Sequence, residues 1–129
     1  MLNQIEVDAE EERLRQQAAD LPDFQRQAFY QMAKRRLKDP DTYATLNWCF
    51  FAGLHHFYLD QWLRGLFNLL VSVAGVGLLF TSAWLVGLLM LLAIAAVEFY
   101  QLLRSQIIIQ HWNNRVMRHL LDTGDYLQR

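Results

Sequence analysis

The chain has 129 residues, of which 53% are hydrophobic, and its formal net charge is −1. This near-neutral balance provides no extended basic field, so nucleic-acid binding is not expected. The single cysteine, Cys49, excludes an intramolecular disulfide and any cysteine-rich zinc motif. The neutral average conceals a division along the chain. Residues 1–42 carry seven basic and nine acidic side chains, whereas residues 43–103 carry only Asp60, Arg64 and Glu98.

Residues 1–42 form a polar head, which we expect to be helical and cytoplasmic. Apolar residues recur near helical spacing over residues 5–38. The pair Leu21-Pro22 interrupts this pattern, so we predict two helices, with Asp20 as a cap and Pro22 in the first turn of the second helix. Pro40 ends the run, because proline disfavours helix in the residue before it. The N-terminus lacks the basic-then-apolar order of a cleaved signal peptide, so we expect membrane insertion to use an internal segment.

Three apolar stretches follow, at residues 43–59, 65–80 and 83–103. A helix needs about 20 apolar residues to cross a hydrocarbon core of roughly 30 Å. The third stretch meets this length, the second is slightly short, and the first is short and interrupted by Asn47, His55 and His56. Two short polar tails cannot cover three such helices in a soluble fold. We therefore predict an all-α integral membrane protein whose membrane domain spans residues 43–104.

Basic residues lie just before and just after the apolar block: Lys34, Arg35, Arg36 and Lys38, then Arg104, Arg115 and Arg118. Positive charge favours the cytoplasmic side, so both ends are expected there, and the number of crossings is then even. The simplest solution is a helical hairpin of residues 65–80 and 83–103, preceded by an interfacial or short membrane helix at residues 43–59. In the alternative, all three stretches cross, and Arg64 and the basic tail lie outside. A bacterial inner membrane suits a protein of this kind.

Residues 105–129 form the third predicted domain. Apolar residues recur at helical spacing over residues 104–121 among basic ones, and Thr123-Gly124 stops the helix. This pattern is typical of an amphipathic helix that lies on a membrane surface, with Trp112 at headgroup depth.

The most specific local pattern is the run Gly53-Leu54-His55-His56-Phe57-Tyr58-Leu59-Asp60, followed by Gly65-Leu66-Phe67-Asn68-Leu69-Leu70. Over residues 43–104 the chain resembles the two-transmembrane (TM-two) domain family, whose first helix ends in Gly-x-His-Arg-Phe-Tyr-Leu-Gly and whose last apolar segment carries an acid. The positions that fit are Gly53, His55, Phe57, Tyr58, Leu59, Gly65 and Leu69, with Glu98 in the place of the acid. His56 replaces the family's Arg, Asp60 replaces its final Gly, and Phe50 stands where an earlier Gly is expected. The resemblance implies a small multipass membrane protein, without an agreed biochemical activity.

Glu98 is an ionisable residue inside an apolar segment. Such a group costs a few kcal/mol to insert and usually faces protein or water. In either crossing scheme, Glu98 lies on the same side of the bilayer as the region from His55 to Arg64. We therefore predict that Glu98 pairs with His55, His56 or Arg64; the alternative is that it snorkels to the membrane surface. Adjacent histidines on a helix diverge by about 100°, so we predict neither a metal site nor another cofactor.

No catalytic motif is present, so an enzyme with a small-molecule substrate is not expected. We predict a non-enzymatic oligomeric scaffold or partner-binding membrane module, whose partners are the lipid bilayer and a second copy or another membrane protein. Small residues at Gly75, Gly77 and the Ala83–Gly87 pair would allow helices to approach closely. The alternative is a small oligomeric channel or membrane-permeabilising effector lined by Glu98, Asn68 and Ser72, although residues 83–97 lack a long polar stripe.

Overall fold

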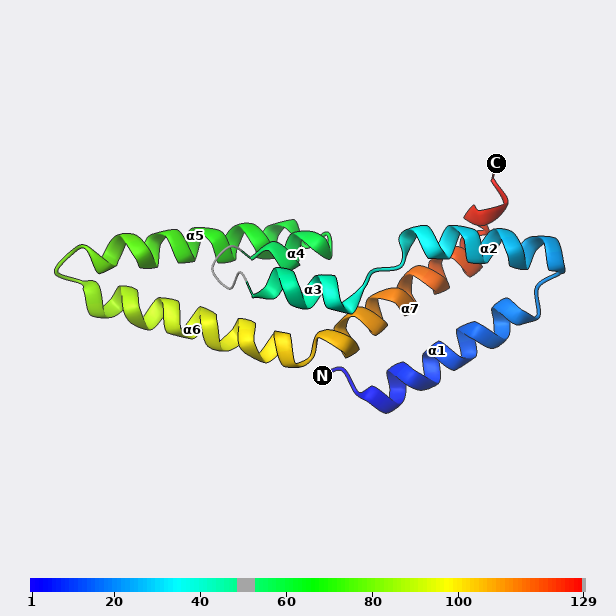
Figure 1. Ribbon diagram of the computed structural model, residues 1–129, viewed down its shortest axis with the longest axis horizontal. Coiled ribbons are helices and arrows are strands. Elements are labelled where there is room, and N and C mark those ends of the chain that lie inside the picture. Colours follow the sequence, from blue (N-terminus) through cyan, green and yellow to red (C-terminus); the bar gives the residue numbers. More distant parts are fainter. Residues whose placement is uncertain (49–52, 129) are drawn as a thin grey trace. The chain divides into compact units, whose positions relative to one another are not determined.

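The structure is a computed structural model that describes residues 1–48 and 53–128. Its elements follow one another as α1 (Gln4–Ala19), α2 (Asp23–Arg36), α3 (Pro40–Asn47), α4 (Leu54–Tyr58), α5 (Trp62–Leu79), α6 (Trp84–Leu103), α7 (Ser105–Thr123) and the 3-10 helix η1 (Asp125–Leu127) (Figure 1). No strand occurs among these residues, so the all-α class is confirmed. The chain divides into two compact units. A terminal unit comprises Met1–Pro40 and Gln106–Arg129, and a central unit comprises Asp41–Ser105.

The N-terminal part of the terminal unit forms two helices, as predicted. Asn3 caps α1, since its side chain accepts a hydrogen bond from the backbone N–H of Ile5. The predicted cap of the second helix is wrong: Asp20 is the C-cap of α1, and Pro22 is the N-cap of α2. The backbone of Pro22 is extended (ψ 148°). The helical conformation therefore begins only at Asp23.

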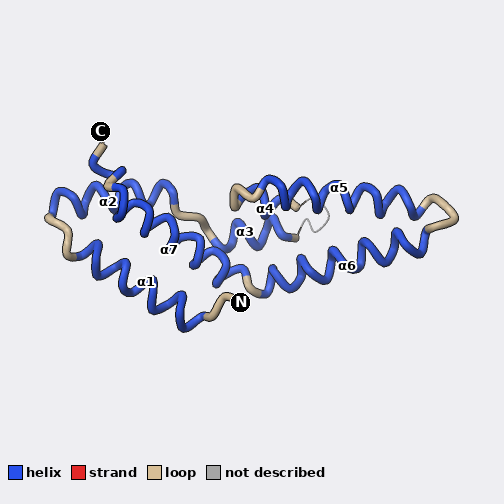
Figure 2. The backbone as a smooth tube through the Cα atoms, turned by 180° about the vertical axis from the view of Figure 1, so that it is seen from behind, coloured by secondary structure: helices blue, strands red, loops and turns tan. Residues whose placement is uncertain are grey.

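The terminal unit has its own apolar core, although the sequence gives no sign that the head and tail of the chain belong together. Phe29 and Leu120 are fully buried, and the rings of Phe29 and Tyr126 meet edge to face with centroids 5.6 Å apart. The buried Asn114 of α7 donates a hydrogen bond to the carbonyl oxygen of Val7 in α1 (2.9 Å). In both ribbon and tube views α7 lies between α1 and α2 (Figure 2). Part of the apolar face that we expected to lie on a membrane surface is therefore covered by protein.

The central unit is built on a hairpin of α5 and α6, and the predicted pair of apolar helices is confirmed. Helix α5 begins three residues before the predicted start, at Trp62, and α6 covers nearly the whole predicted span. Both helices are long and apolar enough, by length and composition, to cross a membrane. The turn between them is closed by Thr81, whose hydroxyl donates to the carbonyl oxygen of Leu78 (2.8 Å) and accepts from the N–H of Ala83 (3.1 Å).

The stretch at residues 43–59, predicted as one helix, instead carries most of the short helix α3, which begins at Pro40, and the whole of the short helix α4. The eight residues of α3 extend only about 12 Å at 1.5 Å per residue, well short of a bilayer core. Helix α4 begins after Gly53, whose φ of 61° is a left-handed conformation that glycine adopts at low cost. This change of direction prevents one continuous helix through residue 53. Cys49 and Phe50 lie outside the described residues.

Candidate functional site

A cluster of polar side chains lies inside the central unit, around the carboxylate of Glu98 on α6. Glu98 is 2% exposed, and its Oε2 atom lies 2.6 Å from Nε2 of the fully buried His55. Its Oε1 atom lies 3.4 Å from Nε2 of His56 and accepts a hydrogen bond from Nδ2 of Asn68. The predicted pairing of Glu98 with the histidines is therefore present in the structure. The carboxylate joins α4, α5 and α6.

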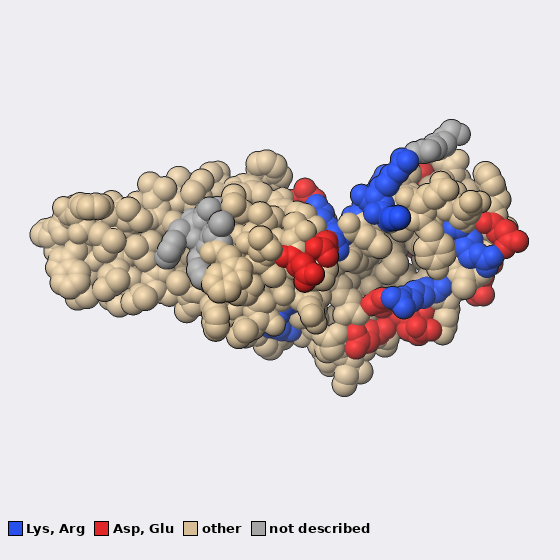
Figure 3. All heavy atoms as spheres, in the orientation of Figure 1, with Lys and Arg blue, Asp and Glu red and all other residues tan. Residues whose placement is uncertain are grey.

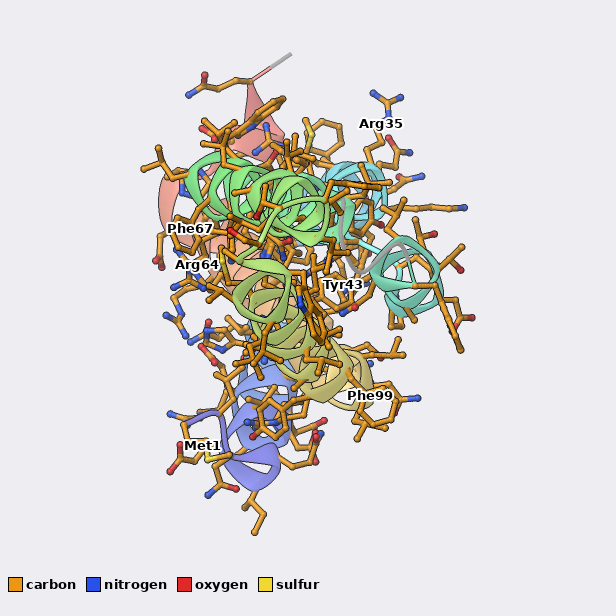
Figure 4. All side chains as sticks on the ribbon, turned by 90° about the vertical axis from the view of Figure 1, so that its left-hand side faces the viewer. Met1, Arg35, Tyr43, Arg64, Phe67 and Phe99 are labelled. Atoms are coloured by element: carbon orange, nitrogen blue, oxygen red, sulfur yellow. The ribbon has the colours of Figure 1, made fainter. Side chains whose placement is uncertain are left out.

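Arg64, the third predicted partner of Glu98, makes a different contact. Its guanidinium donates a hydrogen bond to Oε1 of Gln61 at 3.3 Å. Arg64 and Phe67, one turn apart on α5, extend to the same side of the helix (Figure 4). The carboxylate instead takes its α5 contact from Asn68, which faces α6.

A second set of side chains extends this cluster to α3. Nε2 of His55 lies 3.2 Å from Oε1 of Gln101, which also accepts a hydrogen bond from the hydroxyl of the buried Tyr43 (3.3 Å). The rings of Tyr43 and His55 pack edge to face with centroids 5.3 Å apart. Burial, and secondly the negative charge of Glu98, raise the pKa of Tyr43 above its ordinary value. Tyr43 is therefore a neutral donor at physiological pH.

Tyr43 and Gln101 are not among the predicted site residues, and Asn68 and Ser72 were predicted only as possible lining of a pore. Ser72 donates to Oδ1 of Asn68 (3.3 Å), and both side chains are buried. A signal was present in the sequence: Gly65, Asn68, Ser72 and Gly75 recur every three or four residues, which places them on one face of α5.

The expected divergence of the adjacent histidines is wrong as an argument about their rings. The ring centroids of His55 and His56 lie 4.0 Å apart, and both Nε2 atoms approach the same carboxylate. The 100° separation applies to the Cα–Cβ bonds of a helix. Each imidazole extends beyond Cβ through two rotatable bonds, so two neighbouring rings can converge on a group that lies between them.

The other residues of the family-like motif shape the chain around the cluster. Gly65 packs against Phe57, because a Cβ at residue 65 would lie 2.8 Å from Cζ of that ring. The ring of Phe57 also meets that of Trp62 edge to face (5.1 Å). Asp60 has a φ of 58°, and aspartate tolerates this left-handed conformation better than most residues. The family pattern has Gly at the position of Asp60, and the left-handed backbone at this position favours Gly. Tyr58 ends α4.

The small residues of the hairpin do not all serve the same purpose. A Cβ at Gly87 would lie 2.5 Å from the carbonyl oxygen of Gly75, and one at Gly75 would lie 3.0 Å from the side chain of Leu91. Gly75 and Gly87 therefore allow α5 and α6 of the same chain to approach closely. At Gly77, by contrast, an added Cβ would meet nothing within 4 Å.

A cavity of about 510 Å³ lies beside the cluster in the central unit. Its polar lining comes from His56, Arg64, Asn68, Glu98 and Gln101, and the rest of its wall is apolar: Leu63, Phe67, Ala93, Ile94 and Val97. His56 and Glu98, which approach each other inside the cluster, therefore also line this cavity.

Comparison with family models, curated proteins and solved structures finds no match to this chain. The fold and the site therefore define the class of the protein only as an all-helical chain with two apolar helices of spanning length.

Proposed function

We propose that the protein is a membrane-anchored, non-enzymatic scaffold: α5 and α6 cross the bilayer as a hairpin, and the terminal unit is held at the cytoplasmic surface for a partner. The partner is a second copy of the chain or another membrane protein. The observation that carries this proposal is the distribution of polarity across the hairpin.

The hairpin has its polar side chains inside and its large apolar side chains outside. The buried residues of α5 are Gly65, Asn68, Ser72 and Gly75, and those of α6 are Gly87 and Glu98. Large apolar side chains, among them Phe67 and Val73, are more than 60% exposed. In water this arrangement would expose an unusually large apolar surface, whereas in lipid it is favourable. On the face of the hairpin visible in Figure 3, no charged side chain interrupts the outer parts of α5 and α6.

The terminal unit has the opposite character, since it buries Phe29 and Leu120 and carries most of the charge of the chain. Such a unit is suited to the aqueous side of a membrane. The hairpin leaves too few polar groups on its outer faces for solubility, and this favours either lipid or a protein partner as its cover.

The polar side chains required for the channel alternative are already bound to one another. Asn68, Ser72 and Glu98 form hydrogen bonds within one hairpin rather than projecting toward neighbouring copies. We therefore do not propose a pore.

Membrane anchoring is tested by expressing the full chain in bacteria and extracting the membranes at alkaline pH. The proposal predicts that the chain stays in the membrane pellet and is released only by detergent. Release into the alkaline supernatant would contradict it. The matched control is a variant with two charges on the outer face of α5, Leu70→Lys and Val73→Glu, which should reduce retention.

Partner binding is tested by crosslinking in intact membranes, followed by mass determination of the detergent-solubilised complex. We expect a discrete species larger than one chain, containing either further copies or a second membrane protein. A monomer with no crosslinked partner would contradict the scaffold role while leaving membrane anchoring intact.

A further inference from the structure

We propose that His55, His56 and Glu98 bind a single transition-metal cation of the Zn²⁺ type, with a fourth coordination position open to the cavity beside them. The site goes beyond the scaffold function and does not depend on it.

The three residues supply the ligand atoms that such a cation prefers. One ligand atom from each of His55, His56 and Glu98 can be chosen so that all three lie within 4.8 Å of one another, and all three residues are buried. Two imidazole nitrogens and one carboxylate oxygen, with a fourth position left for water or another ligand, form a recurrent zinc arrangement. Imidazole ligands also suit Cu, Ni and Co. The ligand types therefore indicate a class of metal ions and not one metal within that class.

The spacing of the ligand atoms fits one ion with a small adjustment. With metal–ligand bonds of about 2.0–2.1 Å, two ligand atoms of a tetrahedral site lie roughly 3.3 Å apart. Nε2 of His56 lies 3.4 Å from Oε1, the other oxygen of the same carboxylate, and is therefore also near an ion bound at Oε2. The separation between Nε2 of His55 and Oε2 of Glu98 is 2.6 Å and must lengthen by roughly 0.7 Å when an ion enters between the two atoms.

The protein does not satisfy this cluster completely by itself. Oε2 of Glu98 is buried and close to His55, yet it makes no aligned hydrogen bond among the described residues. Nδ1 of His55 is likewise buried without such a bond. The contact between His55 and Oε2 is thus close but poorly aligned, and a cation bound at Oε2 would replace it with a direct bond to the carboxylate.

Residues around the cluster can hold the ligands in place. Asn68 donates to Oε1 of Glu98, which leaves Oε2 available to an ion. A hydrogen bond of this kind orients a metal ligand and is often worth a factor of 10–100 in metal affinity. Gln101 lies 3.2 Å from Nε2 of His55, the nitrogen that would bind the ion, so this contact gives way when the ion enters, and Gln101 keeps the hydrogen bond from the hydroxyl of Tyr43. The cavity of about 510 Å³ reaches both His56 and Glu98, so it provides a route for the ion and space for a fourth ligand.

The test uses the full chain in detergent, without a polyhistidine tag, after treatment with a chelator. Titration with Zn²⁺ against a chromophoric chelator should give one ion per chain, and Co²⁺ should give the intense visible absorption of a tetrahedral site. Glu98→Gln and His56→Ala should each reduce the affinity at least tenfold. His111→Ala and Glu6→Gln, which change the same residue types in the terminal unit, should leave it unchanged. Absence of a tetrahedral Co²⁺ spectrum from the wild-type chain, or equal affinity in Glu98→Gln, would overturn the proposal.

A measurement on the wild-type chain alone keeps the proposal testable if the variants fail to fold. X-ray absorption of the Zn²⁺-loaded chain should show scattering from two imidazoles and from oxygen ligands. Absence of imidazole scattering would refute the site, because His55 and His56 supply two of its three protein ligands. Neither measurement depends on membrane orientation or on partners, so failure here is distinct from failure of the scaffold proposal.

Discussion

Replacing Gly87 by alanine tests whether α5 and α6 really meet at their glycines. The added Cβ would lie 2.5 Å from the carbonyl oxygen of Gly75 and 2.9 Å from Cβ of Leu78. Ordinary contacts begin at 3.4 Å. The helices would therefore have to separate locally by roughly 0.9 Å, because the oxygen belongs to a backbone that cannot rotate away.

Gly77→Ala is the matched control for the loss of stability expected from Gly87→Ala. Both substitutions replace glycine by alanine within α5 or α6, so the gain of helix propensity, about 0.5–1 kcal/mol, is common to them. At Gly77 an added Cβ would meet nothing within 4 Å. The difference between the variants is thus the overpacking strain, which is about 1–3 kcal/mol for one extra carbon in a packed interior.

The assay is unfolding of the full chain in mixed micelles by titration with SDS, followed by tryptophan fluorescence. Gly87→Ala should unfold at a lower SDS fraction than the wild type, and Gly77→Ala at an equal or higher one. If Gly87→Ala is as stable as Gly77→Ala, α5 and α6 do not pack through residues 75 and 87, and the hairpin geometry is wrong.

Substitutions at three further sites, one of them with an exposed control, test other parts of the structure. Asp60→Gly should be about 1 kcal/mol more stable than Asp60→Ala in the same SDS titration, because residue 60 has a φ of 58°. Neither variant retains the carboxylate, so the comparison isolates the backbone conformation. Equal stabilities would argue against that conformation. Phe29→Ala should destabilise the terminal unit by about 3–5 kcal/mol and make α7 sensitive to protease. Phe24→Ala, at a 78% exposed position, should change the free energy of unfolding by no more than about 0.5 kcal/mol. Similar effects of the two substitutions would refute the core of the unit. Asn68→Leu should cost about 1–3 kcal/mol, because Glu98 loses a buried hydrogen-bond donor; an unchanged SDS midpoint would show that the bond contributes nothing.

Part of the fold could be predicted because hydrophobic runs and proline act locally. The lengths of the runs at residues 65–80 and 83–103 give α5 and α6 within three residues at each end. The division of residues 43–59 could not be read in the same way, since it depends on the left-handed conformation of Gly53. The grouping of both ends of the chain into one unit was also not predicted. It rests on contacts between distant residues, such as the hydrogen bond from Asn114 to Val7, which leave no periodic signal.

The site was predictable to the extent that topology limits which residues can meet. The expectation that Glu98 lies on the same side of the bilayer as the region from His55 to Arg64 limited its predicted partners to three, and Glu98 contacts two of them, His55 and His56. The choice of Asn68 instead of Arg64 as the α5 partner depends on helix rotation, which is set by packing at Gly65, Gly75 and Gly87. Tyr43 was not predicted because it reaches the cluster from α3, a helix whose packing the sequence does not determine. Gln101 lies one turn after Glu98 on α6, so helical spacing could have indicated it.

Cysteine accessibility in intact bacteria tests the central claim, that α5 and α6 form a hairpin across the membrane with the terminal unit inside. In a Cys49→Ser background, single cysteines are introduced at Asp23 in α2, at Ser82 in the turn between α5 and α6, and at Asp122 in α7, and each is treated with a membrane-impermeant maleimide. The account predicts labelling of the Ser82→Cys variant in intact cells, and of the Asp23→Cys and Asp122→Cys variants only after the membrane is opened. Labelling of the Asp122→Cys variant in intact cells while the Asp23→Cys variant stays protected would mean an odd number of crossings and would contradict the hairpin.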